Sequence, residues 1–450
     1  MAQKIFIDCS YLYEHPELNT GIQRVVRKVL DNLEKIAPEE NLEIIPVVIS
    51  HANFQQISKE SLYSKKEPTQ KTQSSQTSLT IKSYLKNLYK AFRDLLSALL
   101  PIPIVKNFLY APKDRFGLRY IVEKLFIKPY KSITLKKESS KPTSSAPAVN
   151  RGDILLLIDS TWYLNIWPTV SNLKKDGVRV VSVIYDLIPI THPQFCDDFL
   201  AEVFRKWFYD SLKYIDKFIT ISHTVEKDLK KFLKSQFDAP IEDKRFDHFL
   251  LGSDFNYKQS QNQNIRDDIK KLYSNNENIY LTVSTIEPRK NHSYLLDAFE
   301  LLWQNGSEAT LLIVGRVGWK VEETMHRINT HPELHKKLFI YTDLNDVELK
   351  FCYENSKMLL FASIVEGFGL PIVESLTHHL PVLASDTPIH KEVGADMIGY
   401  FDLSNPQDLA KKIEEIQKNG IPKKLIPPKN YSWLTWEDST RDLLRKACDG

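Results

Sequence analysis

Short apolar runs alternate with amphipathic stretches along most of the chain, and each run is followed by a polar or glycine-containing turn. Apolar runs of four to eight residues between turns are typical of buried strands, and three- or four-residue apolar spacing is typical of helices. Their alternation predicts an α/β fold with parallel sheets. The strands expected in the first half are residues 4–9, 42–49, 154–158, 178–185 and 218–222, and those in the second half are residues 279–283, 310–314, 338–341, 358–361 and 382–384.

A polar stretch rich in Asn, Gln and Lys, residues 256–278, separates these two groups of strands. Its composition suits a connection between domains. We therefore expect an N-terminal domain over residues 1–255 and a C-terminal domain over residues 256–430. The last segment, residues 431–450, is expected to contain a helix at residues 438–447.

An insertion, residues 54–150, interrupts the N-terminal domain. Its flanks, residues 61–80 and 131–150, are rich in Ser, Thr, Lys, Gln and Pro, which is typical of flexible segments. Residues 81–131 carry 11 Lys or Arg and three Asp or Glu, a net charge of +8, with apolar side chains at helical spacing over residues 81–100. Such a helix suits an anionic membrane surface, but it equally suits packing on the N-terminal domain with its lysines in water.

Composition narrows the class of protein. The 450 residues are 42% hydrophobic, which is enough for the cores of two or more domains, and the net charge of +3 does not indicate a nucleic-acid partner. The cysteines are scattered without the spacing of metal ligands, so we expect free thiols in a reducing compartment. The sequence shows no signal peptide and no apolar run of about 18 residues. We therefore expect a cytoplasmic protein, peripheral on the inner face of the plasma membrane if the basic block binds lipid.

Candidate chemistry is concentrated in residues 366–374. This segment follows the expected strand at residues 358–361 and runs into the opening of a helix at residues 371–377. A glycine turn between a strand and a helix presents backbone N–H groups and the positive helix end to an anion. Glu366 and Glu374 are thus placed to hold different hydroxyls of one elongated ligand, while the backbone between them faces phosphate.

A basic pair forms the second candidate element. Arg289 and Lys290 follow the expected strand at residues 279–283 and precede an expected helix at residues 293–302. Two cations beside the positive end of a helix suit an anionic group such as a diphosphate. A solvated surface pair is the alternative interpretation.

The E-x7-E pattern of Glu366 and Glu374 closely resembles the signature of the retaining glycosyltransferases of family 4, and residues 281–291 resemble the basic loop of that family. The two elements stand about 75 residues apart, in the family's order. The resemblance covers residues 1–50 and 150–445. It implies an α/β fold of the GT-B type: two facing Rossmann-like domains with a central cleft, and a C-terminal helix that crosses back to the N-terminal domain.

The resemblance also implies roles for individual residues. A nucleotide diphosphate sugar would be the donor, with Lys290 and Arg289 at its diphosphate. Glu374 would accept hydrogen bonds from the ribose, and Glu366 would lie against the donor sugar. Glu366, Lys290 and Arg289 are therefore expected to act in catalysis. The donor is also expected to meet the turn formed by Gly367, Phe368, Gly369 and Leu370. No cofactor and no metal are expected, because no D-x-D motif ends a predicted strand.

In the first half, a Thr-Gly-Ile-Gln-Arg run opens a helix after the first expected strand. The resemblance implies that its Gly21 faces the donor phosphate and the acceptor. This form of the motif is similar to that of bacterial enzymes that build surface polysaccharides, including mannosyl- and rhamnosyltransferases. Arg24, one turn into the helix, either reaches the ligand or stays in water. Tyr185 stands where many relatives have histidine, which leaves Tyr185, Asp186 and His192 as candidates on the sugar or acceptor side.

These patterns lead to one expected function and two alternatives. The expected function is transfer, with retention, of a hexose or deoxyhexose, mannose from GDP-mannose being preferred. The acceptor would be a glycan or a lipid-linked saccharide in surface polysaccharide synthesis. The alternatives are a GT-B nucleotide-sugar epimerase and a non-catalytic scaffold of a polysaccharide assembly complex.

Overall fold

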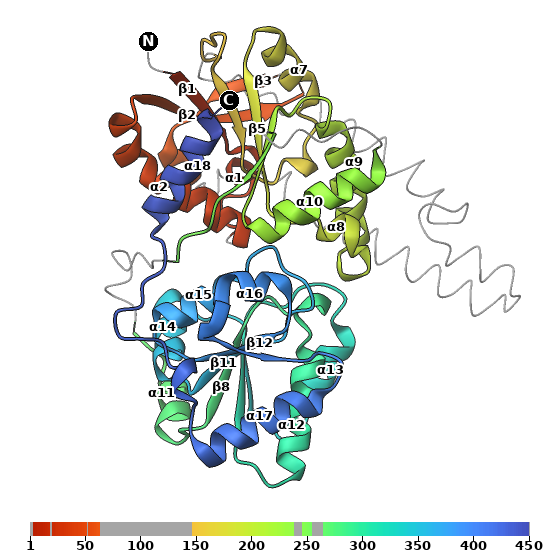
Figure 1. The fold of residues 1–450 in the computed structure, drawn as a ribbon, viewed down its shortest axis with the longest axis vertical. Coiled ribbons are helices and arrows are strands. Elements are labelled where there is room, and N and C mark those ends of the chain that lie inside the picture. Colours follow the sequence, from red (N-terminus) through yellow and green to blue (C-terminus); the bar gives the residue numbers. More distant parts are fainter. Residues whose placement is uncertain are drawn as a thin grey trace, which may run out of the picture. The chain divides into compact units, whose positions relative to one another are not determined.

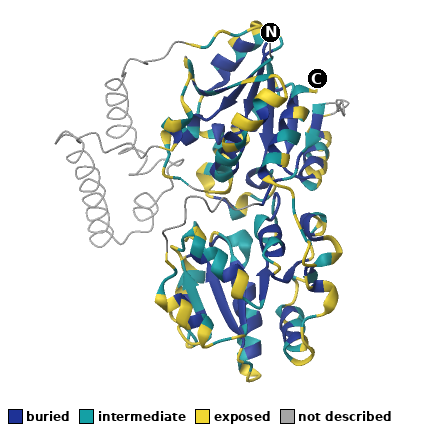
Figure 2. Cartoon of the chain, turned by 90° about the vertical axis from the view of Figure 1, so that its left-hand side faces the viewer, coloured by how far each residue is buried: buried dark blue, intermediate teal, exposed yellow. Residues whose placement is uncertain are grey.

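The computed structural model describes residues 3–18, 20–51, 53–63, 146–237, 245–253 and 264–449. The expected helix at residues 81–100 and the rest of the basic block lie outside these ranges. Figure 1 shows two β-sheets, each with helices packed on both of its faces. The central strands of both sheets are buried, and exposed residues gather on the outer sides of the helices (Figure 2).

The N-terminal sheet has the strand order β3-β2-β1-β4-β5-β6-β7. All neighbours pair in parallel except β2 and β3, which are antiparallel. The strands are β1 (Gln3–Asp8), β2 (Leu42–Ser50), β3 (Asn53–Gln56), β4 (Ile154–Leu157), β5 (Arg179–Ile184), β6 (Lys217–Thr220) and β7 (Phe246–His248). The five strands expected in this half are confirmed. The sequence missed β3 and β7, and it placed the start of the insertion at residue 54, inside β3.

Successive residues of β1 alternate between two cores, as the two faces of a strand require. Ile5 and Ile7 share a core with residues of α2 and α18, whereas Phe6 shares a core with residues of the helices on the other face. The helices of this half are α1 (Ser10–Glu14), α2 (Gly21–Glu39), α7 (Trp167–Lys175), α8 (Ile188–Thr191), α9 (Asp198–Ser211) and α10 (His223–Gln236), and the 3₁₀ turns are η1 (Lys59–Leu62), η3 (Thr161–Tyr163) and η4 (Pro193–Phe195).

The C-terminal sheet is parallel throughout, with the strand order β10-β9-β8-β11-β12-β13. Its strands are β8 (Ile279–Val283), β9 (Thr310–Val314), β10 (Leu338–Tyr341), β11 (Met358–Phe361), β12 (Val382–Ser385) and β13 (Gly399–Phe401). The five strands expected in this half are confirmed, and the three-residue β13 was missed.

Seven helices accompany this sheet in the described part of the chain, together with three 3₁₀ turns, of which η7 (Pro288–Lys290) precedes α12. The helices are α11 (Asp267–Ser274), α12 (His292–Gln304), α13 (Glu322–Asn329), α14 (Asp346–Asn355), α15 (Leu370–Thr377), α16 (Pro388–Gly394) and α17 (Pro406–Asn419), and the other two turns are η8 (Ala395–Met397) and η9 (Lys423–Leu425). Helix α11 lies within residues 256–278, where the sequence indicated a polar connection. Its Ile269 and Leu272 are buried, so this part of the stretch belongs to the folded domain.

Helix α18 (Trp436–Cys448) runs beside α2 of the N-terminal half (Figure 1). The Ser439 hydroxyl donates to the Leu250 carbonyl at 2.6 Å, and Arg441 forms ion pairs with Glu39 and Glu40 at 2.7 and 2.8 Å. Just before the helix, the indole N–H of Trp433 donates to the Leu251 carbonyl at 2.7 Å. The end of the chain therefore packs on the N-terminal domain.

None of the helices in the described ranges combines the length and the apolar character that spanning a bilayer requires.

Candidate active site

The strand order of the C-terminal sheet creates a place for a ligand. The chain leaves β8 on one side to form β9 and β10, and it returns on the other side of β8 to form β11. The loops that follow β8 and β11 therefore diverge at the carboxyl edge of the sheet, which is where open α/β sheets bind ligands. The first loop contains the 3₁₀ turn η7 (Pro288–Lys290), with Arg289 and Lys290, and the second contains Glu366.

Glu366 lies between the two cations. Its Oε2 is 2.5 Å from Nη1 of Arg289, and its Oε1 contacts Nζ of Lys290. The other side of the guanidinium pairs with Glu287, with 2.6 Å between Nη2 and Oε1. The side chains of Arg289, Lys290 and Glu366 are 20%, 10% and 8% exposed. The solvated surface pair that the sequence allowed is therefore wrong, and the two loops share a buried cluster of two cations and two carboxylates.

The charges in this cluster shift one another's pKa. Burial alone would raise the pKa of the Glu366 carboxyl, but Arg289 and Lys290 outweigh it and hold that pKa at about 2. Burial and the neighbouring Arg289 lower the pKa of Lys290. Burial raises the pKa of Glu287 despite the same arginine. Glu366 is thus firmly ionised, and it is the principal counter-ion of both cations.

Glu374 lies on α15 and is 3% exposed. Both of its oxygens have partners: the Tyr353 hydroxyl donates to Oε2 at 2.9 Å, and Nη2 of Arg24 donates to Oε1 at 3.0 Å. The sequence left open whether Arg24 points to water, and the structure shows that it reaches Glu374. Tyr353 was missed, since a tyrosine inside an amphipathic helix carries no signal that sets it apart from a core residue.

The turn between the two glutamates is closely packed. A Cβ at Gly367 would lie 2.2 Å from the Tyr185 carbonyl oxygen, and the Gly367 carbonyl accepts a hydrogen bond from the Ser222 hydroxyl at 2.9 Å. Gly369 has a φ of +103°, in the region that favours glycine, and it immediately precedes α15. Phe368 is buried, and Leu370 is the first residue of the helix. Both glycines are therefore required by the backbone.

The three candidates after β5 have different surroundings. The Tyr185 hydroxyl is buried and donates to the Ile158 carbonyl at 2.7 Å, so this side chain belongs to the N-terminal core. Burial raises the pKa of Asp186 although Arg289 and Lys290 act against it, which places Asp186 within the field of the cluster. His192 interacts with Thr191, Phe195 and Asp228, and none of these residues belongs to the cluster.

A second switch point lies in the N-terminal sheet, where β1 is flanked by β2 and β4. Asp8 ends β1 and Asp159 follows β4, and both are buried. Burial and the nearby Asp159 raise the pKa of Asp8 to about 8. Gly21 begins α2 and is exposed, with open space where a Cβ would project. Neither aspartate was predicted as a candidate, although an acidic residue at the end of a buried strand is a visible signal in the sequence.

Comparison with known proteins assigns the domain that carries this cluster. Residues 264–430 match the family model described as "Glycosyl transferases group 1". These residues form a group 1 glycosyltransferase domain. The matched range includes Arg289, Lys290, Glu366 and Glu374.

The names printed for curated relatives of the chain are those of mannosyltransferases or of O-antigen biosynthesis glycosyltransferases. The chain is 30% identical over 306 residues to the serotype-specific mannosyltransferase WbdA of Escherichia coli, covering 66% of this chain and 37% of that protein. It is 26% identical over 255 residues to the O-antigen chain mannosyltransferase RfbU of Salmonella typhimurium, covering 55% of this chain and 63% of that protein. The chain thus spans little more than a third of the length of WbdA.

Among solved structures, Anabaena Alr3699/HepE in complex with UDP and glucose is similar along the whole chain. The TM-score is 0.52 with 12% sequence identity, over 99% of this chain and 96% of that one. At this identity the likeness concerns the fold. Together with the two parallel sheets, it identifies the architecture as GT-B.

Proposed function

We propose that this protein transfers a mannosyl residue from a nucleotide diphosphate sugar, preferably GDP-mannose, to a saccharide acceptor, with retention at the anomeric carbon. The observation that carries the proposal is the position of Glu366, held between Arg289 and Lys290 at the carboxyl edge of a group 1 glycosyltransferase domain. The names of the relatives WbdA and RfbU support mannose as the sugar.

The reaction needs positive charge where the bond breaks. When the bond between the anomeric carbon and the diphosphate oxygen breaks, negative charge grows on the diphosphate. Lys290 and Arg289 would stabilise this charge, which is the task that a divalent metal performs in other transferases. We therefore expect transfer to continue in the presence of EDTA.

The acceptor would attack from the face that the diphosphate leaves. A bond forms between the acceptor oxygen and the anomeric carbon, and the acceptor proton passes to the departing diphosphate oxygen. In this step Glu366 would orient the donor sugar through its hydroxyls, and Glu374 would accept hydrogen bonds from the ribose. No protein nucleophile takes part, and Asp186 would lie on the sugar side.

The charge of residues 81–131 supports a further part of the proposal, that the chain attaches peripherally to an anionic membrane carrying a lipid-linked acceptor. These residues lie outside the described ranges. Co-sedimentation with anionic vesicles, compared with a chain lacking this block, tests the attachment. Equal partitioning of the two proteins would contradict it.

Donor binding is tested by thermal shift with GDP, UDP, dTDP and ADP and with their sugar conjugates, in EDTA. We expect one nucleotide to raise the melting temperature of the unchanged chain and to fail with Lys290→Met. Lys411→Met, an exposed lysine of α17, is the matched control. If no nucleotide or sugar conjugate raises the melting temperature, the proposed donor site is wrong.

Kinetics test the individual roles. With the donor that binds, Lys290→Met and Glu374→Gln are each expected to lose more than about tenfold in kcat/KM, or about 1.4 kcal/mol of transition-state stabilisation. Glu415→Gln, exposed on α17, serves as the control for the glutamate. Smaller losses would mean that the assigned roles are wrong.

A further inference from the structure

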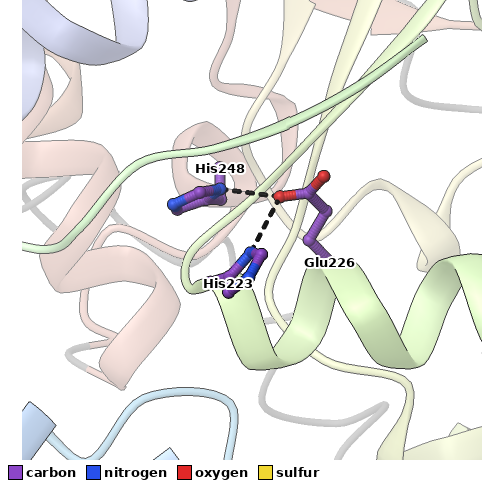
Figure 3. Close-up of side chains that lie close together, drawn as sticks. All are labelled: His223, Glu226 and His248. Carbon is purple, nitrogen blue, oxygen red and sulfur yellow. Dashed lines mark hydrogen bonds and ion pairs between the residues drawn. The ribbon is translucent and has the colours of Figure 1, made fainter. Parts of the chain in front are cut away.

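Two histidines and a glutamate meet on the N-terminal half, and none of them belongs to the charged cluster described above. His223 is the first residue of α10, Glu226 follows one turn later, and His248 ends β7. Figure 3 shows both imidazoles turned toward the same carboxylate oxygen. In the described part of the chain, this is the one group of three or more His, Cys, Asp or Glu whose ligand atoms come close enough for a metal ion.

We propose that His223, Glu226 and His248 form a binding site for a divalent transition metal of the zinc class. Two imidazoles and one carboxylate are a donor set that suits Zn²⁺ and its neighbours, whereas Mg²⁺ and Ca²⁺ prefer oxygen ligands alone. Nothing in this proposal depends on the glycosyl-transfer reaction.

The distances fit a site that needs only small adjustments. Around a tetrahedral zinc ion with bonds of about 2.0–2.1 Å, neighbouring ligand atoms lie about 3.3 Å apart. Oε2 of Glu226 is 3.5 Å from Nδ1 of His223 and 2.7 Å from Nδ1 of His248, and all three ligand atoms lie within 4.8 Å of one another. The His223 and His248 side chains are 49% and 33% exposed, so they have room to rotate and the ion remains reachable from solvent.

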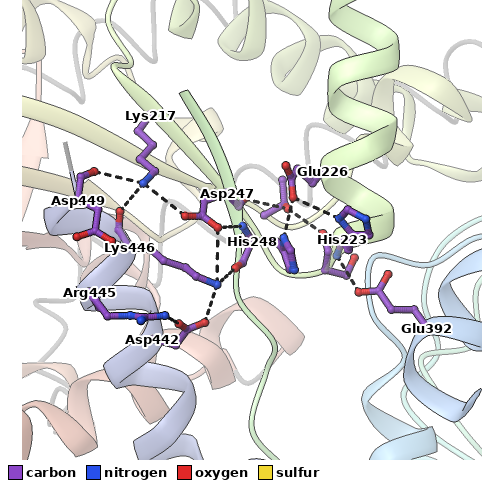
Figure 4. Close-up of polar contacts among 12 residues, drawn as sticks. Lys217, His223, Glu226, Asp247, His248, Glu392, Asp442, Arg445, Lys446 and Asp449 are labelled. Carbon is purple, nitrogen blue, oxygen red and sulfur yellow. Dashed lines mark hydrogen bonds and ion pairs between the residues drawn. The ribbon is translucent and has the colours of Figure 1, made fainter. Parts of the chain in front are cut away.

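The backbone around the site is firmly held. The Ser222 hydroxyl caps α10 by accepting from the Val225 N–H at 3.1 Å, and the His223 N–H donates to Glu392 at 2.7 Å. Figure 4 shows the other side, where the His248 carbonyl accepts a hydrogen bond from Lys446 of α18. Both histidines are thus anchored through their backbones, which leaves their rings available as ligands.

The ammonium group of Lys230 would compete with a metal ion for the Glu226 carboxylate. Its Nζ lies 2.9 Å from Oε1 of Glu226, the oxygen that faces away from the histidines. This contact orients the carboxylate, but its positive charge also opposes a nearby cation. Removal of Lys230 is therefore expected to tighten metal binding, which is the opposite of what removal of a ligand does.

The experiment is calorimetric titration of the full-length chain with Zn²⁺ after treatment with a chelator. We expect one site per chain that weakens at least tenfold in His223→Gln, in His248→Gln and in Glu226→Gln. His15→Gln removes a half-exposed histidine that also lies near one carboxylate, and it is expected to leave the affinity unchanged. Circular dichroism in metal-free buffer checks that each variant is folded.

The lysine variants separate a metal site from a hydrogen-bonded polar contact. Lys230→Met is expected to tighten Zn²⁺ binding several-fold, while Lys227→Met, an exposed lysine on the same helix, has no effect. Co²⁺ bound to the unchanged chain is expected to give the visible absorption of a four- or five-coordinate ion. The proposal would be overturned if the chain binds no Zn²⁺, or if its Zn²⁺ affinity is the same in each of the three ligand variants. The cluster would then be a polar contact between α10 and β7.

Discussion

Replacement of Glu366 by glutamine tests the central feature of the site, the buried carboxylate between two cations. Glutamine keeps the size of the side chain and removes its charge. Arg289 would then keep its ion pair with Glu287, whereas Lys290 would lose the carboxylate that it contacts, in a nearly dry environment. Removing one partner of a buried ion pair destabilises a protein because the remaining charges lose their counter-ion.

The magnitude follows from the pKa of Glu366. That pKa falls from an ordinary 4.5 to about 2, and each unit corresponds to about 1.4 kcal/mol. Ionised Glu366 therefore contributes about 3 kcal/mol to the free energy of unfolding at neutral pH. Because the folded pKa is depressed, this contribution is complete above pH 4.5 and disappears as the pH falls through about 2. At pH 3.5 about 2 kcal/mol would remain.

Urea unfolding, followed by circular dichroism and tryptophan fluorescence, measures the effect at pH 7 and at pH 3.5. We expect Glu366→Gln to cost about 3 kcal/mol at pH 7 and less at pH 3.5. The control Glu415→Gln should stay within about 0.5 kcal/mol at both values. A cost below about 1 kcal/mol that does not change with pH would refute the buried ion pair.

Glu366→Gln is expected to lower the free energy of unfolding but to increase the affinity for a nucleoside diphosphate. The variant leaves a net positive charge in the cluster, so a nucleoside diphosphate without its sugar is expected to bind Glu366→Gln more tightly than it binds the unchanged chain. Calorimetric titration with the nucleotide that raises the melting temperature measures the two affinities. Weaker binding would mean that Glu366 holds the two cations in position rather than competing with the phosphate.

Three further predictions concern neighbouring residues. Gly367→Ala is expected to lower the melting temperature by several degrees, because its Cβ would lie 2.2 Å from a backbone oxygen, whereas Gly21→Ala, which meets open space, should not. Arg24→Gln is expected to cost about 2 kcal/mol in urea unfolding by removing a charged hydrogen-bond partner of Glu374, and an unchanged stability would contradict that contact. Burial and Asp159 raise the pKa of Asp8 to about 8, so the folded chain holds a proton there and loses stability as the pH rises from about 4 to 8. Asp8→Asn should flatten this dependence in melting experiments, and an equally steep curve would argue against the raised pKa.

Local patterns were sufficient for most of the fold because its strands are short, continuous apolar runs buried on both faces. The strands that escaped prediction lack this signal. β3 is the polar sequence Asn53–Gln56 at the antiparallel edge, and β7 and β13 are only three residues long. Their strand conformation depends on pairing with a neighbour, and pairing is not visible in the sequence around them.

In the candidate site, too, residues in local motifs could be predicted and contacts between distant parts of the sequence could not. Arg289, Lys290, Glu366 and Glu374 could be predicted as candidates because they lie in two motifs, each contained in one loop and the start of its helix. The partners of Glu374 could not be found, since Arg24 is 350 residues away in sequence and Tyr353 lies on another helix. Tyr185 shows the converse: its position in a motif suggested a role at the sugar, while burial turns its hydroxyl toward a backbone carbonyl.

The two glutamates differ in how they are supported, and this difference suits the proposed reaction. Glu374 lies within α15, whose neighbouring Ile372, Val373 and Leu376 are buried, so its carboxylate has a fixed position. A fixed acceptor suits the ribose, which is common to every nucleotide donor. Glu366 lies in a loop just before Gly367, and its partners are the long side chains of two cations. In the proposed reaction the diphosphate takes over those cations, and Glu366 is released to meet the sugar hydroxyls. After this exchange the two cations face the diphosphate, and hydrogen bonds from the sugar hydroxyls take the place of the cations at the Glu366 carboxylate.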